Sequence, residues 1–196
     1  MVGIVEKYMH KVSELTGRKH DLFDYYGAED AKYVVVAMGS VTEALEETID
    51  RLNAEGWKVG CVKVHLYRPF STEHFLKAMP STVERICVLD RTKEPGATGD
   101  PLYLDVRDIY YGKENAPLIV GGRYGLGSKD TTPAQLKAVY DNLAAECPRN
   151  QFTIGIVDDV TNTSLPEAED FRIASKGTVR CKFWGLGSDG TVGANK

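Results

Sequence analysis

The residues whose types and spacing best suit ligand chemistry lie at the end of the chain, in the stretch CKFWGLGSDGTVGANK (181–196). Glycines give this stretch backbone freedom, two hydroxyls and an amide add hydrogen-bonding groups, and Lys196 adds a positive charge. Backbone N–H groups, hydroxyls and a cation are the groups with which proteins hold a diphosphate. The candidate cofactor-binding residues are Gly185, Gly187, Ser188, Asp189, Gly190, Thr191, Asn195 and Lys196.

Asp189 sets a limit on this interpretation, because a carboxylate repels a phosphate. Its oxygens could accept from a ribose hydroxyl or an amide, or bond to the backbone within the turn. A further alternative is that the loop only turns the chain toward its next helix. Such loops usually connect a strand to a helix. The segment TVRCKFW (178–184) predicts the strand, and since Lys196 is the last residue we expect the helix to be absent.

Two earlier loops also concentrate chemical groups, DRTKEPGATGD (90–100) and GGRYGLGSKD (121–130). Neither contains the G-x-G-x-x-G dinucleotide pattern or the G-x-x-x-x-G-K-[ST] phosphate loop. The glycines of the second loop favour a turn that positions the cap of the following helix over a ligand site. The histidines show no serine or cysteine partner in sequence, and His65 alternates with apolar residues, as a structural side chain does. We therefore expect this part of the chain to be a scaffold without catalytic residues.

Composition excludes several classes of partner. The net charge is −4, so we expect no nucleic-acid partner. No apolar run approaches the ~20 residues of a membrane span, and the charged N-terminus is unlike a signal peptide, which predicts a cytoplasmic location. The four cysteines are widely spaced and no histidine lies at ligand spacing from them, so we expect no metal site.

The rest of the chain alternates strand and helix patterns. The pattern predicts strands over 33–38, 58–66, 85–90, 117–122 and 152–157, and helices over 2–15, 41–52, 71–79, 100–112 and 132–143. Helix starts are predicted at Ser40 with Glu43, at Asp100 with Pro101, and at Thr132 with Pro133 and Gln135. Alternation with short connections predicts an α/β fold, with a mainly parallel, doubly wound sheet of about five strands and helices on both faces.

These elements divide the chain into four expected parts. Residues 1–30 form an N-terminal helix and connector, and residues 31–160 form the α/β domain. Residues 161–176 form a linker with little periodicity. Residues 177–196 are the opening of a second domain, because a lone strand needs a neighbour to pair its backbone groups.

Several long motifs resemble one family of enzymes. They are VKVHLYRPFSTEHFLKAMP, LDRTKEPGATGDPLYLDV, GGRYGLGSKDTTPAQLKAV, FTIGIVDDVTNTSLP and the C-terminal stretch above. In this order they resemble the pyruvate:ferredoxin or pyruvate:flavodoxin oxidoreductases over essentially the whole chain. The resemblance implies an interior piece of such an enzyme, a domain similar to the C-terminal domain of transketolase followed by the start of a coenzyme-A-associated domain.

The resemblance also implies cofactors and partners for the parent enzyme. It would use thiamine diphosphate, magnesium and iron–sulfur clusters, take coenzyme A as co-substrate, reduce ferredoxin or flavodoxin through other domains, and act as a homodimer. This chain lacks G-D-G followed some thirty residues later by asparagine, and it lacks cysteine clusters. We therefore expect the fragment to be inactive alone, with part of a coenzyme A loop.

Two other functions remain open at this point. One is the C-terminal domain of a different thiamine-dependent enzyme, of the transketolase or pyruvate dehydrogenase type. The other is a separate nucleotide-binding or electron-transfer module of flavodoxin-like topology, which would be yellow when purified. The glycine-rich C-terminal stretch favours the oxidoreductase over both, because the sheet domain ends the chain in the other thiamine-dependent enzymes.

Overall fold

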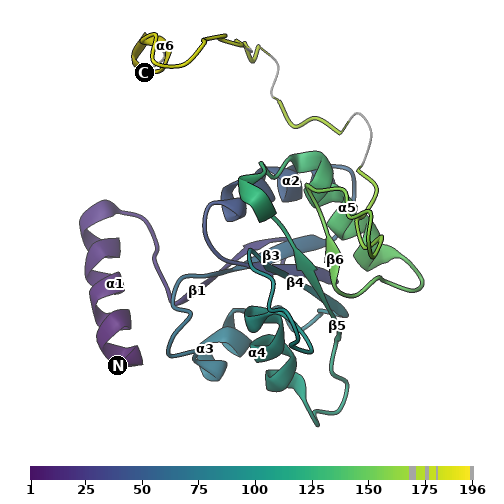
Figure 1. Ribbon diagram of the computed structural model, residues 1–196. Helices are drawn as coiled ribbons and strands as arrows, with labels where there is room; N and C mark the ends of the chain where they lie inside the picture. Colours follow the sequence, from purple (N-terminus) through teal and green to yellow (C-terminus); the bar gives the residue numbers. More distant parts are fainter. Residues whose placement is uncertain (168–170, 175–176, 180, 195–196) are drawn as a thin grey trace.

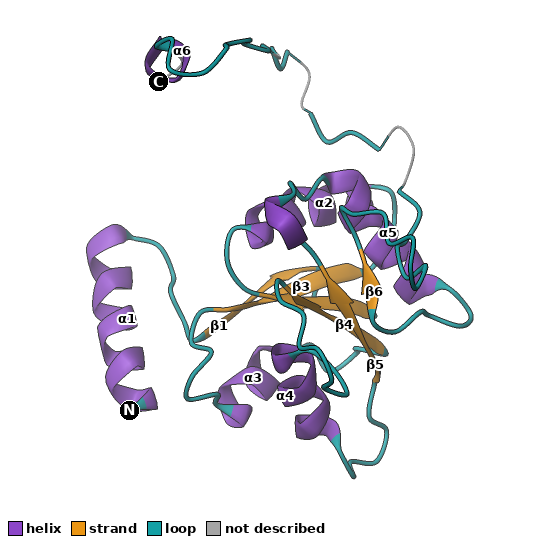
Figure 2. Cartoon of the chain, viewed as in Figure 1, coloured by secondary structure: helices purple, strands orange, loops and turns teal. Residues whose placement is uncertain are grey.

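The computed structural model describes residues 1–167, 171–174, 177–179 and 181–194 of the chain. A six-stranded sheet lies between two layers of helices (Figures 1 and 2). Its strand order is β1-β3-β2-β4-β5-β6, and every neighbouring pair is parallel except β1 with β3. The strands are β1 (Phe23–Gly27), β2 (Tyr33–Ala37), β3 (Val59–Val64), β4 (Arg85–Asp90), β5 (Leu118–Arg123) and β6 (Phe152–Thr153). The predicted α/β class is confirmed.

Strand β1 is an addition to the predicted sheet. It lies in the polar stretch expected to be a connector, and it runs antiparallel to β3 with Phe23 opposite Val64. Its central residues are half-buried at the edge of the sheet. Asp24 and two tyrosines weaken the apolar alternation, so a local pattern does not mark the strand. Pairing with β3 makes it a strand.

Alternate side chains of the central strands fill two separate cores. Val35 and Ala37 of β2 face helices α2 (Val41–Ala54) and α5 (Pro133–Ala144). Val34 and Val36 face the layer that contains α3 (Thr72–Ala78) and α4 (Pro101–Tyr110). All four β2 side chains are fully buried, which explains the continuous apolar run.

Helix α1 (Val2–Thr16) lies beside the sheet domain, next to the β1 edge (Figure 2). Gly17 ends it in the left-handed conformation, at φ 68°. Val2, Val5 and Met9 pack against the core on the α3–α4 side, although no α1 residue is fully buried. The other face of the helix points away from the domain.

The predicted helix caps have mixed outcomes. The capping box of α5 is confirmed: the Thr132 hydroxyl accepts from the Gln135 N–H, and the Gln135 side chain accepts from the Thr132 N–H. Ser40 has helical dihedrals and makes no side-chain cap bond, so the predicted box at α2 is wrong. Asp100 occupies the N-cap position of α4 without a cap bond. The Asp90 carboxylate bonds the α4 N–H groups in its place.

The predictions for the C-terminal third need three corrections. The strand expected over 152–157 is only Phe152–Thr153, because Gly155 turns the chain at φ 80°. The described residues of the expected strand 178–184 are not in a strand, and Val179 and Trp184 are largely exposed. Among the described residues, a strand there has no neighbour to pair with. Lastly, a short helix that was expected to be absent does follow the glycine-rich loop, namely α6 (Thr191–Ala194).

Candidate functional site

The glycine-rich loop at residues 185–191 joins an extended exposed segment to helix α6 (Figure 1). The structure brings three of the predicted residues together: Gly185, Asp189 and Thr191. Gly187, Ser188 and Gly190 form the turn between them. Asn195 and Lys196, the amide and the cation of the predicted site, lie outside the described residues.

The carboxylate of Asp189 organises this loop. One oxygen accepts from the Leu186 N–H at 2.8 Å, and the other accepts from the N–H and hydroxyl of Thr191 at 3.1 and 2.6 Å. These hydrogen bonds, led by the Thr191 hydroxyl, lower the pKa of Asp189 to about 2. Of the roles considered for Asp189, bonding to the backbone within its own turn is therefore the one that the structure contains.

Three glycine positions in the loop have a structural reason. A Cβ on Gly185 would lie 2.5 Å from the Thr191 hydroxyl, so only glycine lets the two segments approach. Gly187 and Gly190 have φ values of 83° and 82°, and Ser188 also has a positive φ of 53°. A left-handed run of this kind favours glycine. Part of the glycine pattern thus serves the turn itself.

The loop still presents hydrogen-bond donors to solvent. The N–H groups of Gly187 and Ser188 have no acceptor among the described residues, and both residues are exposed. The N–H groups of Leu186 and Thr191, in contrast, already bond Asp189. The loop can therefore offer backbone donors, among them those of Gly187 and Ser188, and the Ser188 hydroxyl to a ligand, beside one carboxylate.

The charged loop after β4 has a structural role. Asp90 is 4% exposed, and its two oxygens accept from the N–H groups of Leu102 and Tyr103, both at 3.0 Å. Burial raises the pKa of Asp90, an effect that these two hydrogen bonds partly oppose. The carboxylate at the end of a central strand thus caps α4 and is not directed toward a ligand.

Asp100 and Arg123 connect the two loops that the sequence singled out. The Nε atom of Arg123 lies 2.7 Å from an oxygen of Asp100; Asp100 is buried, and the Arg123 side chain is 11% exposed. The pair joins opposite charges without an aligned Nε–H hydrogen bond. Asp100 also accepts from the Glu94 N–H at 3.2 Å. These charges hold the loops together, which supports the scaffold interpretation.

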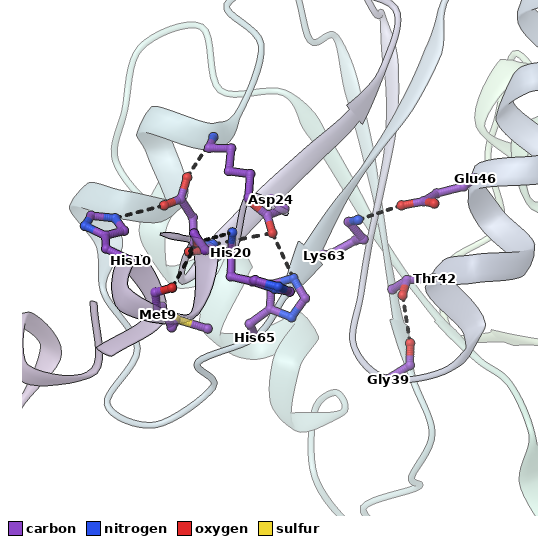
Figure 3. Close-up of polar contacts among 12 residues, drawn as sticks. Met9, His10, His20, Asp24, Gly39, Thr42, Glu46, Lys63 and His65 are labelled. Carbon is purple, nitrogen blue, oxygen red and sulfur yellow. Dashed lines mark hydrogen bonds and ion pairs between the residues drawn. The ribbon is translucent and has the colours of Figure 1, made fainter. Parts of the chain in front are cut away.

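The histidines pair with carboxylates rather than with nucleophiles in most cases. Figure 3 shows His65 of the segment after β3 pointing toward Asp24 of β1, at 3.1 Å. His10 of α1, labelled in the same view, lies 3.2 Å from an oxygen of Asp21. Nearby, Lys63 of β3 and Glu46 of α2 form an ion pair at 2.5 Å. The structural role expected for His65 agrees with this pairing.

His74 has a serine partner that the sequence did not reveal. Its Nδ1 lies 2.6 Å from the Ser71 hydroxyl and its Nε2 lies 3.2 Å from a Glu6 oxygen. In serine hydrolases the serine lies at Nε2 and the carboxylate at Nδ1, so the order is reversed here. Ser71 is also the N-cap residue of α3. The three residues therefore tie α1 to the start of α3. The signal available in sequence was the Ser-x-x-His spacing at a helix start.

The described residues contain neither a metal-binding cluster nor a membrane-spanning helix. Among them, no group of three or more histidine, cysteine, aspartate or glutamate side chains is arranged to hold a metal ion. No helix within the described ranges is long and apolar enough to cross a membrane. Cys61 and Cys87 are buried, and burial raises the pKa of Cys61 to about 12.

Known proteins match this chain closely. Residues 31–136 match the family described as pyruvate:ferredoxin oxidoreductase core domain II. A pyruvate-flavodoxin oxidoreductase of Enterobacter agglomerans is 60% identical over 98% of the chain, and a pyruvate:ferredoxin oxidoreductase of Moorella thermoacetica is 59% identical over 99%. A mitochondrial pyruvate dehydrogenase [NADP(+)] of Euglena gracilis is 50% identical over 100%. The chain spans 16%, 17% and 11% of these relatives, respectively.

A solved structure gives a weaker match. A 2-oxoglutarate:ferredoxin oxidoreductase from Magnetococcus marinus, with 2-oxoglutarate, coenzyme A and succinyl-CoA bound, is 21% identical. The match covers 69% of this chain and 23% of that chain, with a TM-score of 0.44. The family match covers more than half of the sequence and all of β2 to β5. The chain belongs to the pyruvate:ferredoxin oxidoreductase core domain II family.

Proposed function

We propose that this chain is a segment of an enzyme that converts pyruvate and coenzyme A to acetyl-CoA and CO2 while reducing ferredoxin or flavodoxin. The observation that carries the proposal is the 58–60% identity of three pyruvate oxidoreductases over 98–99% of the chain. Because the alignment extends over nearly the whole chain, the similarity includes both the core of the sheet domain and its loops. The parent would use thiamine diphosphate, magnesium and iron–sulfur clusters, all bound by residues outside this chain.

Within the parent, the sheet domain would act as a scaffold. Its buried carboxylates, Asp90 and Asp100, are engaged by a helix start and by Arg123, which leaves them no part in chemistry. The test is an assay of the pure chain with pyruvate, thiamine diphosphate, magnesium, coenzyme A and a viologen dye. No dye reduction above the blank is expected, and a pyruvate-dependent rate would contradict the scaffold role.

The glycine-rich loop would form one wall of a coenzyme A diphosphate site that the complete enzyme finishes. The unpaired N–H groups of Gly187 and Ser188 support this role, because they are the donors that a diphosphate requires. Asp189 would hold the loop in shape and would not contact the ligand. Asn195 and Lys196 would complete the site from its C-terminal side.

Kinetics of the complete enzyme test this loop. Gly187→Val and Lys196→Ala should raise the Michaelis constant for coenzyme A about ten- to a hundredfold, with that for pyruvate nearly unchanged. Lys113→Ala, on an exposed turn of the sheet domain, is the matched control and should change neither constant. Equal effects of the loop variants on both substrates would show that the loop only turns the chain.

The choice of electron acceptor would lie outside this segment. Relatives whose names specify flavodoxin, ferredoxin and NADP(+) all share it at 50–60% identity. Exchanging this segment between a flavodoxin-linked and a ferredoxin-linked relative should therefore leave the acceptor preference unchanged. An acceptor preference that moves with the segment would contradict the proposal.

We further propose the boundaries 31–160 for the sheet domain, a homodimeric parent, and a cytoplasmic location, with no nucleic-acid or membrane partner.

A further inference from the structure

Helix α1 carries two neighbouring rows of apolar side chains. The inner row, Val2, Val5 and Met9, packs against the sheet domain. The outer row is defined by residues three or four positions apart, which therefore share one helix face, and it remains exposed. Its members, with their exposed fractions, are the N-cap residue Met1 (83%) and the helical residues Ile4 (64%), Tyr8 (60%), Val12 (45%) and Leu15 (87%).

Polar contacts determine which face of α1 points outward. Glu6 pairs with His74 of α3 at 3.2 Å, and His10 pairs with Asp21 at 3.2 Å. The Ser13 hydroxyl accepts from the His20 N–H at 2.9 Å. These contacts lie along three turns of the helix and all reach the sheet domain or the segment leading to it. They hold α1 in one rotation, so the outer row cannot turn inward without breaking them.

A row of this size requires an explanation. Single exposed apolar residues are ordinary, whereas a contiguous apolar patch on a soluble protein marks an interaction site. An amphipathic helix needs one apolar stripe to pack on its own domain. Helix α1 has that stripe and a second one beside it. The second stripe is therefore available for another surface.

We propose that the outer row of α1 docks against another part of the same polypeptide in the complete enzyme. The proposal rests on the proposed function, since it takes this chain as a segment of the longer oxidoreductase. The relatives align with 98–99% of this chain, yet the aligned part makes up only 16–17% of their length. Most of each relative's polypeptide is thus available to cover the helix.

The size of the row favours an intramolecular partner over a second copy. Five side chains are far fewer than the ~20–30 residues that each side contributes to a standard two-chain interface. A partner within the same chain has a high effective concentration, so a small apolar contact is enough to hold it.

The charges beside the row specify the partner further. Lys11 borders the outer row, with its Nζ 5.2 Å from the centre of the Tyr8 ring, and Lys7 lies one turn earlier. Neither lysine forms an ion pair with a described residue. The docking surface should therefore be apolar at its centre and carry carboxylates along the edge that meets these lysines.

Cysteine labelling tests the proposal on the complete enzyme and on this chain alone. Ile4→Cys and Val12→Cys place small reporters in the outer row, and Glu14→Cys places the matched control on the exposed polar face. Maleimide labelling is quantified on the α1 peptide by mass spectrometry, so other cysteines do not interfere. In this chain alone the three positions should label at similar rates. In the complete enzyme the two outer-row positions should label slower by about tenfold or more, with Glu14→Cys unchanged.

Each other result overturns a specific statement. Fast labelling of the outer row in an active complete enzyme would overturn the docking. Labelling of this chain alone that slows with rising concentration would assign the row to a second copy, and would overturn it too. Outer-row protection in a complete polypeptide that has no pyruvate-dependent activity would sustain the docking and defeat the proposed function. If a cysteine variant misfolds, hydrogen–deuterium exchange of the α1 backbone amides is compared between the unmodified complete enzyme and this chain alone. Equal exchange rates in the two proteins would overturn the docking.

Discussion

An oxygen of Asp100 lies 2.7 Å from Nε of Arg123, and the two side chains are 3% and 11% exposed. This buried pair joins the start of α4 to the end of β5, the two places where the sequence concentrates charge. Its neighbour Asp90 is buried as well and caps α4. The charges at this edge of the sheet thus stabilise the junction of two loops.

Asp100→Asn should destabilise the protein strongly. The substitution leaves Arg123 buried without its countercharge, which costs about 3–5 kcal/mol of unfolding free energy. Urea denaturation measures the loss. Glu84→Gln, which removes one member of the exposed Lys32–Glu84 pair, is the control and should cost less than about 1 kcal/mol. Similar losses of unfolding free energy for both variants would show that the Asp100–Arg123 pair stabilises the protein no more than an exposed ion pair does.

Gly27→Ala should break the junction of β1 with β3. Gly27 has φ 132°, and a Cβ there would lie 2.5 Å from both the Cα of Gly60 and the carbonyl oxygen of Val59. Backbone atoms cannot yield as side chains do, so we expect a loss of about 2–3 kcal/mol. Thermal unfolding provides the measurement. Gly3→Ala in α1 meets nothing within 4 Å and should be neutral or slightly stabilising. If Gly27→Ala left the thermal stability unchanged, the backbone of β1 would not approach Gly60 and Val59 as closely as described.

The Asp189 turn should respond to acid at an unusually low pH. Its pKa in the folded loop is lowered from 3.8 to about 2. A lowered carboxyl pKa stabilises the fold above the unfolded pKa, and this contribution is lost as the pH falls through the folded pKa. The amide signals of Leu186 and Thr191 should therefore titrate with a midpoint near 2 in NMR spectra.

Two variants control this titration. Asp189→Asn should abolish it, because the amide side chain carries no titrating proton. Asp159→Asn, at an exposed aspartate in another loop, should leave it unchanged. A midpoint near 3.8 in the unmodified protein would show that the carboxylate does not accept the hydrogen bonds described.

A chain that stops after Phe171 should retain a cooperative thermal transition. Leu165 is 9% exposed and belongs to the core between the sheet and α2, and Phe171 packs against that core. The large apolar side chains beyond it, such as Phe183 and Trp184, are mostly exposed. The shortened chain should thus lose little buried apolar area. A non-cooperative melt monitored by circular dichroism would place the end of the folding unit beyond Phe171.

The sequence by itself determined most of the sheet and its helices. The apolar run of β2 predicted a strand with two covered faces, and Thr132 with Gln135 predicted a capping box, because both signals depend only on neighbouring residues. The α/β class followed from the regular alternation of such local patterns. For the C-terminal stretch, the strand expected before the glycine-rich loop and the absence of a helix after it were both wrong.

The tertiary structure decided what depends on residues far apart in sequence. Strand β1 exists because β3 pairs with it, and the segment around Phe183 is not a strand because no neighbour is present among the described residues. The cap of α4 comes from Asp90, ten residues before the position that local pattern favours. Strand pairing and long-range caps depend on where the fold places each backbone group. A one-dimensional pattern contains only the spacing of residues along the chain, and so it cannot contain that information.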